Sequence, residues 1–496
     1  MAAAWQGQAA GAMRYIRAMA ELDEAWISRT VPRWSGALRS LGLGHGDIIG
    51  VLAGNQPEFV AARDAATALG VILMPVNPRL APPEIEQMMA RAHARVLLAD
   101  AALAPGPTLT LPAGARRLDF AGLDALADTV PPGPTAPDGA FGGTLLFTSG
   151  TTGRPKGCLR TPEAEAARAR ELMATYRLSS EDVHLIVCPL AHSAPGIFLR
   201  AARAAGARTI LSPRFDARGF LADVARFRAT VFFLVPTQVE RLLALPDAER
   251  AAADLSSVRA WIVAGAPFAP ASKRRLLDWL GPGKLWEFYG STETGTVTVL
   301  PPEAQPGPPA CVGWPQPGTD LRVVDPTGQD VAPGEVGEIY VRGPAVMTAY
   351  LEGDQQTRLG DHLSVGDLGR VLPDGALVLV DRKHDMIITG GVNVYPADVE
   401  RALCEHPDVA GAVVTGVPDP DWGERVVALV AARPDAAAAP TAAALLAFLH
   451  GRIAAYKIPK QLVVVASPDE LPTSPTGKPL RRAARNHPAL RSAPTG

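Results

Sequence analysis

Short apolar runs alternate with helical patterns through the middle of the 496-residue chain. Between residues 140 and 290 the runs are separated by stretches rich in Ala, Arg and Leu, such as Gly219–Arg228 and Pro270–Leu280, which predict helices. The predicted strands of this region are Thr144–Thr148, His184–Cys188, Arg208–Leu211, Thr230–Val235, Arg259–Val263 and Lys284–Phe288. Residues 35–75 and 84–99 repeat the pattern, with strands expected at Asp47–Leu52 and Arg95–Leu98. Strands separated by helices form βαβ units, so the sequence predicts a mostly parallel sheet.

The pattern changes twice toward the C-terminus. Residues 301–350 are rich in Gly and Pro and carry alternating runs such as Leu321–Val324 and Glu338–Val341, which predict a small β subdomain. Beyond about residue 381 the chain predicts a compact α+β unit of ordinary domain size. Its expected elements are the strands Met386–Ile388, Ala410–Val414, Arg425–Ala431 and Leu462–Ala466 and the helices Pro396–Glu405 and Ala442–Ala455. We therefore expect an α/β fold with a large N-terminal domain at 1–381 and a small α+β C-terminal domain at 385–496, divided at 382–384.

Composition and charge exclude several classes of protein. With 48 basic and 50 acidic residues the net charge is -2, and no basic stripe indicates nucleic-acid binding. No apolar run approaches the roughly 20 residues of a membrane-spanning helix, and charges interrupt the N-terminal segment before a signal peptide can form. The four cysteines are isolated and make no CxxC pair, which favours buried thiols in a cytoplasmic protein. Only seven of the basic residues are lysines. Lys156, Lys383 and Lys478 lie in the motifs described below, Lys457 and Lys460 lie in the C-terminal region, and Lys273 and Lys284 lie outside any motif.

The strongest local signal follows the strand Thr144–Thr148. The segment Leu146–Gly157 combines hydroxyls, glycines and one lysine, so its main-chain N–H groups, hydroxyls and ammonium could all face a polyphosphate. It is not a Walker A loop, because neither Gly-Lys pair of the chain is followed by Ser or Thr. The residues expected at the phosphates are Thr148, Ser149, Gly150, Thr151, Thr152, Gly153 and Lys156.

Eight motifs, in order along nearly the whole chain, resemble those of the adenylate-forming superfamily of acyl-CoA ligases, peptide-synthetase adenylation domains and luciferases. After the first loop they are Pro189–His192, Gly265–Pro267, Tyr289–Glu293, Gly337–Gly343, Gly366–Gly369, Asp381–Gly391 and Pro475–Lys478. The resemblance implies an acid–CoA ligase that uses ATP, Mg²⁺ and coenzyme A. It would activate a carboxylate as an acyl-adenylate and then transfer the acyl group to the CoA thiol.

The resemblance also assigns a nucleotide site. It places adenine against Tyr289 and the segment of Gly265, Ala266 and Pro267, and ribose against Asp367 and Arg382. Further nucleotide contacts are expected from Glu287, Phe288, Gly290, Ser291 and Thr292. Glu293 is expected to bind Mg²⁺, since a carboxylate at a strand end beside a phosphate loop suits an ion that keeps several waters.

Lys478 is the expected catalytic residue of the C-terminal domain, acting with Glu293, Thr292 and Thr148. Prolines and a glycine surround it, so it lies in a loop from which its ammonium can project. The resemblance places it between the substrate carboxylate and the α-phosphate, where a compact ammonium can stabilise developing charge. A surface lysine is the alternative. Lys457 and Lys460 could contact CoA phosphates or be solvated.

The second half-reaction requires a mobile C-terminal domain, again by resemblance. Rotation about 382–384 would withdraw Lys478 and bring Gly390 and Gly391 to a tunnel for the pantetheine thiol. The hinge residue of the family is usually Asp or Lys, but here it is His384. Because histidine titrates near neutral pH, we expect the rotation to be pH-sensitive.

The acid is expected to contact His192, Ser193, Thr237, Gly265, Gly290 and Gly295. These residues include no carboxylate for an amino-acid ammonium, and their small size suggests room for a bulky apolar acid, long-chain, aromatic or polycyclic. His192 could instead be a simple polar cap after a strand. Two alternatives to the CoA ligase stay open: an enzyme that performs one half-reaction or serves a carrier-protein phosphopantetheine arm, and an adenylate-binding protein without turnover.

Overall fold

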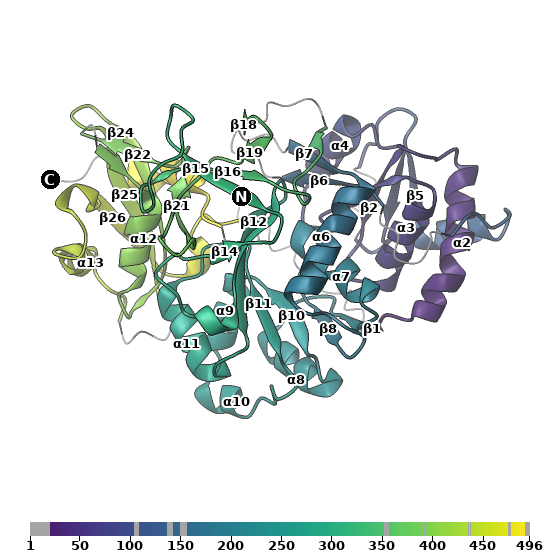
Figure 1. Cartoon of the computed structure of the whole chain (residues 1–496), viewed down its shortest axis with the longest axis horizontal. Helices are drawn as coiled ribbons and strands as arrows, with labels where there is room; N and C mark the ends of the chain where they lie inside the picture. The colour runs from purple at the N-terminus through teal and green to yellow at the C-terminus, as the bar shows by residue number, and fades with distance from the viewer. Residues whose placement is uncertain are drawn as a thin grey trace.

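The computed structural model describes residues 20–103, 109–135, 142–148, 156–351, 357–390, 392–434, 436, 438–474 and 478–491. Within these residues the chain forms four sheets, two of them large and accompanied by helices (Figure 1). The predicted α/β fold is confirmed. In the same residues no helix has both the length and the apolar composition needed to cross a bilayer.

A seven-stranded sheet carries the strand that leads into the predicted phosphate loop. Its order is β17-β7-β6-β3-β2-β4-β5, in which β6, β3, β2, β4 and β5 are parallel and β7 and β17 are added antiparallel. The strands are β2 (Ile48–Leu52), β3 (Ile72–Val76), β4 (Val96–Ala99), β5 (Arg116–Asp119), β6 (Thr144–Thr148), β7 (Lys156–Arg160) and β17 (Ala349–Tyr350). The helices α2 (Glu24–Ser40), α3 (Pro57–Ala68), α4 (Pro82–Arg91) and α5 (Phe120–Ala127) accompany it. Strands buried on both faces explain the nearly continuous apolar runs of this region.

An eight-stranded sheet, ordered β1-β9-β8-β10-β11-β12-β13-β14, supplies the second half of the N-terminal region. Its strands are β1 (Ala20–Glu21), β8 (Val183–Ile186), β9 (Arg208–Leu211), β10 (Val231–Leu234), β11 (Ala260–Val263), β12 (Leu285–Ser291), β13 (Gly295–Leu300) and β14 (Trp314–Pro315). Its helices are α6 (Pro162–Thr175), α7 (Ser193–Ala204), α8 (Ala217–Phe227), α9 (Pro236–Leu243), α10 (Asp247–Ala251) and α11 (Pro270–Leu280). The strand predicted to end at Phe288 continues to Ser291, because β13 pairs with it antiparallel as far as Gly295.

The predicted small β subdomain is a third, antiparallel sheet, and it extends well past residue 350. It contains β15 (Asp320–Val324), β16 (Gly337–Arg342), β18 (Thr357–Leu359), β19 (His362–Ser364), β20 (Asp367–Val371) and β21 (Leu377–Arg382). Asp367, in the motif Gly366–Gly369, therefore begins a strand, and Arg382, in the predicted boundary 382–384, ends one. The two residues are direct partners in the β20–β21 ladder.

The C-terminal region forms its own α+β layer, drawn in yellow-green beside β21 in Figure 1. Its elements are β22 (Ile387–Thr389), β23 (Val392–Val394), α12 (Pro396–Cys404), β24 (Val409–Asp419), β25 (Gly423–Ala432), α13 (Ala442–Leu449), β26 (Gln461–Val465), α14 (Arg481–Arg485) and α15 (Pro488–Arg491). The helix predicted to run to Ala455 ends at Leu449, because Gly451 adopts a left-handed backbone conformation with φ +76°.

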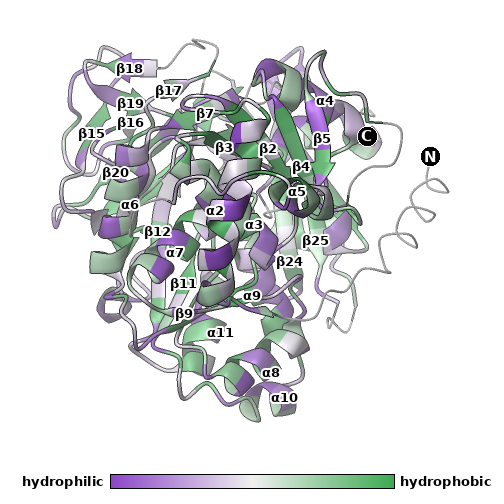
Figure 2. Ribbon diagram, turned by 90° about the vertical axis from the view of Figure 1, so that its right-hand side faces the viewer, coloured by the Kyte–Doolittle hydropathy of each residue, from purple (hydrophilic) through white to green (hydrophobic). Residues whose placement is uncertain are grey.

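The apolar core is divided in the same way as the sheets. In Figure 2 most strands of the sheets are coloured as hydrophobic, whereas the helices carry both hydrophilic and hydrophobic residues. Every buried cluster formed by the described residues lies either before residue 380 or after residue 386. The expected core thiols are found for Cys158, Cys188 and Cys311, whereas Cys404 is half-buried, and all four are free.

Candidate active site

The turn between β12 and β13 holds Glu293 in a fixed position. The hydroxyl oxygen of Ser291 accepts hydrogen bonds from the main-chain N–H groups of Glu293 and Thr294, both at 3.1 Å. The main-chain N–H of Met347 donates to the carbonyl of Glu293 at 2.7 Å. The glutamate is only 9% exposed, and the hydroxyl of Tyr350 donates to its Oε1 at 3.3 Å. These contacts fix the carboxylate that the sequence predicts as a metal ligand.

Tyr350 also contacts Lys156, the lysine that the sequence predicts to bind phosphate. Lys156 begins β7, and its Nζ lies 4.9 Å from the centroid of the Tyr350 ring. Thr148, which ends β6, is the direct strand partner of Lys156. The structure thus brings Thr148, Lys156 and Glu293 to one region, with Tyr350 as a contact that the motifs did not reveal. The predicted loop residues Ser149, Gly150, Thr151, Thr152 and Gly153 lie outside the described residues.

Arg160, at the other end of β7, supports the same turn from inside and was also missed by the sequence. Its side chain is fully buried. Its Nε donates to the carbonyl of Thr292 at 3.1 Å, its Nη2 donates to the same carbonyl, and its Nη1 donates to the carbonyl of Ala345. Burial lowers the pKa of the guanidinium to about 10, which still leaves it charged at neutral pH. A buried cation therefore lies directly behind the turn of Glu293.

The predicted ribose residues form a hydrogen-bonded group. The Tyr289 hydroxyl donates to Asp367 Oδ2 at 2.6 Å, and Arg382 Nε lies 3.2 Å from Asp367 Oδ1. The Tyr289 ring, expected to offer its face to a base, is only 8% exposed, and burial together with Asp367 raises its pKa well above the ordinary value. Gly265, with φ +94°, follows β11, and the adjacent Ala266 is half-buried while Pro267 is exposed.

Glu287 and Phe288 precede Tyr289 in β12, and their side chains have other partners. Glu287 Oε1 forms a buried ion pair with Lys273 Nζ at 2.7 Å, so its side chain is engaged inside the protein. Any nucleotide contact of Glu287 would have to come from its main chain. The partly buried Phe288 ring packs against Phe198 and Phe233, with ring centroids 6.2 and 5.9 Å apart.

Lys478 reaches this group from the C-terminal region. Its main chain is fixed by a hydrogen bond from Ser474 N–H to the Lys478 carbonyl at 2.8 Å and by one from Lys478 N–H to Ser474 Oγ at 3.1 Å. The side chain is exposed to solvent, yet enough protein surrounds the ammonium to lower its pKa. The charge of Arg382 lowers this pKa further, whereas the charges of Asp367 and Glu293 raise it. Lys478 therefore lies within electrostatic range of the ribose and metal candidates.

His192 is in the same electrostatic environment. It occupies the N-cap position of α7 but makes no capping hydrogen bond with its side chain. Burial lowers its pKa, and the charges of Arg79 and Lys478 lower it further. All three effects favour the neutral imidazole, which distinguishes His192 from an ordinary solvated cap. Arg79 is a further residue near the site that the motifs did not indicate.

The other predicted pocket residues are small for reasons of main-chain packing. A Cβ on Gly290 would lie 2.0 Å from the Gly295 carbonyl oxygen, and one on Gly295 would lie 2.8 Å from Cβ of Ala345. Main-chain packing therefore gives Gly290 and Gly295 a structural reason to be small, and their role in making room for the acid stays a prediction. Ser193 Oγ accepts a hydrogen bond from Arg168 Nη2 at 2.9 Å, and Thr237 is exposed on α9.

The hinge candidate His384 is exposed, and the tunnel candidate Gly390 lies on the C-terminal layer. His384 lies near Gly366, and Gly390, with φ +56°, packs so closely on Trp422 that a Cβ would meet its ring at 2.9 Å. Gly391 lies outside the described residues. Lys457 forms an ion pair with Asp398 at 2.9 Å. Lys460 lies over the Trp422 ring, 5.1 Å from its centroid.

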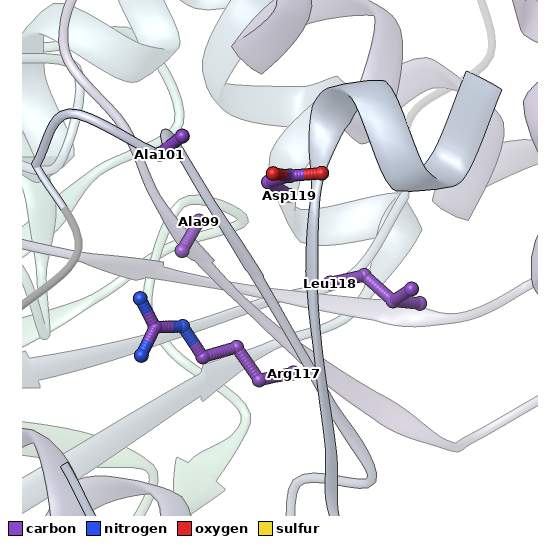
Figure 3. Close-up of a pocket in the computed structure, with 5 residues that line it drawn as sticks. All are labelled: Ala99, Ala101, Arg117, Leu118 and Asp119. Carbon is purple, nitrogen blue, oxygen red and sulfur yellow. The ribbon is translucent and has the colours of Figure 1, made fainter. Parts of the chain in front are cut away.

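A separate surface pocket of about 400 Å³ lies at the carboxyl ends of β4 and β5 (Figure 3). It is lined by Ala99, Ala101, Arg117, Leu118 and Asp119. None of these is a predicted site residue, so this pocket does not compete with the group around Lys478. Among the described residues, no three His, Cys, Asp or Glu side chains are placed to bind one metal ion. The described His, Cys, Asp and Glu side chains therefore do not by themselves complete a metal site at Glu293.

Comparison with known proteins gives matches along nearly the whole chain. The family model described as AMP-binding enzyme matches residues 27–351, and that of the AMP-binding enzyme C-terminal domain matches residues 398–478. An indoleacetate–CoA ligase from Aromatoleum aromaticum is 36% identical over 92% of this chain and 91% of its own length. A feruloyl-CoA synthase from Amycolatopsis sp is also 36% identical, over 94% of this chain and 93% of its own.

Solved structures agree with this result. ATP-bound MatB from Rhodopseudomonas palustris is 28% identical, covers 93% of this chain and 92% of its own, and gives a TM-score of 0.82. The apo form of that protein, also 28% identical and covering 94% and 93%, gives 0.73.

Proposed function

The chain belongs to the AMP-binding enzyme family as an AMP-forming acid–CoA ligase, and we propose that it activates an aromatic carboxylic acid. The observation that carries the mechanism is the position of Lys478. A residue from the C-terminal layer reaches the charges of Glu293, Asp367 and Arg382, all of which belong to the N-terminal region. This arrangement suits the first half-reaction, in which a carboxylate oxygen attacks the α-phosphorus of ATP and pyrophosphate leaves.

In this proposal each charged residue of the site has its own role. Lys478 stabilises the negative charge that develops between the carboxylate and the α-phosphate, where a preorganised ammonium contributes most. Lys156 neutralises phosphate charge while the Tyr350 ring holds its ammonium. Asp367 and Arg382 orient the ribose, and binding of both reactants in line provides a further share of the rate.

Glu293 is a suitable ligand for Mg²⁺. The Tyr350 hydroxyl donates to its Oε1, and among the described residues no group of three His, Cys, Asp or Glu side chains encloses a metal there. Mg²⁺ commonly uses one or two protein carboxylates together with phosphate oxygens and waters. When bound, the ion would neutralise phosphate charge. The protein's part is to keep the Glu293 turn rigid through Ser291 and Arg160.

Two features support an aromatic acid. The partly buried Phe288 ring is backed by Phe198 and Phe233, which offers an aromatic surface beside α7. At the N-cap of the same helix, His192 is within electrostatic range of the cations Arg79 and Lys478, whose positive charge favours a carboxylate there. The two relatives named for indoleacetate and ferulate, both aromatic acids, agree with this substrate class.

We place the domain boundary at 382–384, with His384 as the hinge. After adenylation, rotation there would withdraw Lys478 and bring the Gly390 face of β22 to the site. The CoA thiolate would then attack the acyl carbon, and AMP would leave. The division of the apolar core between residues 380 and 386 supports this boundary.

The test is a substrate panel with two readouts. The purified protein is incubated with ATP, Mg²⁺ and CoA and with indoleacetate, ferulate, benzoate, decanoate or phenylalanine, and acyl-CoA is measured by mass spectrometry. ATP–pyrophosphate exchange is measured in parallel without CoA. We expect both signals with indoleacetate, ferulate or benzoate. Higher turnover with decanoate would refute the aromatic class, exchange without acyl-CoA would indicate a carrier-protein acceptor, and absence of both signals would indicate a binding protein.

A further inference from the structure

Arg481 makes the densest group of ion pairs in the described C-terminal region. It begins α14, three residues after Lys478, and is only 9% exposed. Its Nε and Nη2 donate to the two oxygens of Glu400 at 3.0 and 2.7 Å. Its Nη1 donates to Asp381 Oδ1 and to Asp385 Oδ2, both at 2.8 Å. One guanidinium thus binds three carboxylates, and nothing in the reaction described so far uses it.

The three carboxylates lie on different sides of the proposed hinge. Asp381 belongs to β21 and is the strand partner of Leu368 in the N-terminal sheet. Lys383, the residue before His384, is also attached to the N-terminal region. Its N–H donates to the Gly366 carbonyl at 2.8 Å, and its Nζ lies 2.8 Å from Glu338.

After His384, the carboxylates that bind Arg481 belong to the C-terminal region. Asp385 and Glu400 follow His384 and belong to the same region as Arg481. A rotation about His384 would therefore carry Arg481, Asp385 and Glu400 together. Asp381 would stay behind.

Asp381 has a second contact across the hinge. Its Oδ2 accepts a hydrogen bond from the main-chain N–H of Ala397, in the first turn of α12, at 2.7 Å. Its side chain is only 2% exposed. Burial raises its pKa to about 6 although Arg481 opposes the shift, so the carboxylate is costly to bury here. A rotation that separates the two regions would break both contacts and return Asp381 to water.

We propose that Arg481 is a positioning residue for adenylation: through Asp381 it fastens the Lys478 loop to the N-terminal region, and this contact is released for thioester formation. The inference rests on the proposed function, because it requires two half-reactions separated by a rotation. In this proposal Arg481 does not contact the substrate and acts on adenylation through the position of Lys478. The short segment from Lys478 to Arg481 is what transmits the constraint.

The chain offers a matched pair of substitutions for the test. Asp381→Asn and Asp385→Asn each weaken a carboxylate contact to the same nitrogen of Arg481 at the same 2.8 Å, on opposite sides of His384. ATP–pyrophosphate exchange reports adenylation, and CoA-dependent release of AMP from a supplied acyl-adenylate reports thioester formation. We expect Asp381→Asn to slow exchange about tenfold, as for loss of a charge-assisted hydrogen bond, and to change thioester formation less than twofold. Asp385→Asn should change both rates by the same factor.

A second variant guards against misfolding. Arg481→Lys keeps a cation but cannot bind three carboxylates, and it should show the same selective loss of exchange. Arg485→Met, which removes an exposed pair with Glu424 from the same helix, is the control and should leave the ratio of the two rates unchanged. Thermal unfolding identifies any variant that is merely unstable.

The outcomes distinguish failure of the positioning role from failure of the proposed ligase function. If the wild-type protein is active and Asp381→Asn or Arg481→Lys slows both half-reactions equally, or neither, the positioning role is refuted while the ligase function stands. If the wild-type protein performs neither half-reaction with any acid, the proposed function fails first.

Discussion

Replacing Lys478 by alanine removes one ammonium from the site and changes little else. The hydrogen bonds that close its loop involve the main chain of Lys478 and the main chain and hydroxyl of Ser474, so the substitution leaves them intact. The side chain is exposed, and such substitutions usually alter stability by no more than about 0.5 kcal/mol. A change in rate can therefore be assigned to the missing charge.

The size of the effect follows from the surrounding charges. Removing one preorganised group that stabilises transition-state charge costs about 3–4 kcal/mol, or roughly a hundredfold to a thousandfold in rate. Arg382 stays close enough to act on the same charge, since its own charge lowers the pKa of Lys478. We therefore expect the lower end, about a hundredfold loss of adenylation. Lys478→Arg should recover little, because a broad guanidinium would have to fit beside Arg382.

The assay separates the two half-reactions. ATP–pyrophosphate exchange with the best acid of the panel should fall about a hundredfold in Lys478→Ala. Thioester formation from a supplied acyl-adenylate should remain within about twofold of the wild type, because the ammonium has no part in attack by the thiolate. Arg482→Ala, an exposed charge nearby, is the control. Equal losses in both assays would refute the assignment of Lys478 to adenylation.

Three further predictions test the surroundings of the site. Tyr350→Phe removes the hydroxyl that donates to Glu293 but keeps the ring beside Lys156, so KM for MgATP should rise a few-fold. Tyr350→Ala also removes the ring and should raise KM further. An unchanged KM in both variants would exclude a role for Tyr350. Arg160→Met leaves two buried carbonyls without their donor, so urea unfolding should show a loss of about 2–4 kcal/mol, and unaltered stability would contradict the buried contacts. Burial lowers the pKa of His184 to about 4, so below pH 6.5 the unfolded chain binds a proton that the folded chain rejects. Lowering the pH from 7 to 5 should therefore cost the wild type about 2 kcal/mol more than His184→Leu, and equal losses would refute this.

Much of the fold could be predicted because strands in a covered parallel sheet must be apolar on both faces. Thr144–Thr148 and Arg208–Leu211 were predicted with the bounds that the structure has. The errors fall where pairing or one residue decides the end of an element. β12 continues through Tyr289 because β13 pairs with it, which the local pattern around Gly290 does not reveal. The C-terminal helix ends early at a left-handed glycine, although the run of alanines favours a longer helix.

The candidate site was predictable only where a residue lies inside a motif. Lys156, Glu293, Asp367 and Lys478 do, and the structure brings all of them to one region. Their supports, Arg160, Tyr350 and Arg481, carry no such signal.

The reason is that these supports act through tertiary contacts. Arg160 contacts carbonyls 132 and 185 residues away, and Arg481 reaches a carboxylate 100 residues away. Sequence spacing cannot reveal such contacts. Lys273 is a further example, because it lies outside every motif and yet pairs with Glu287, one of the nucleotide candidates.

The distribution of lysine and arginine follows from what each position must do. A chain with seven lysines among 48 basic residues uses arginine almost everywhere. At position 481 only a planar fork with several donors can bind Glu400 in bidentate fashion and still donate to Asp381 and Asp385. At position 478 the same fork would be a disadvantage, because the side chain must enter beside Arg382 and act as a compact charge. The two residues are three positions apart, so the rigid ion pairs of Arg481 hold the chain just beyond the loop that Lys478 closes with Ser474. If this division of roles is correct, exchanging the two residue types should impair adenylation at both positions, at 481 through loss of position and at 478 through loss of fit.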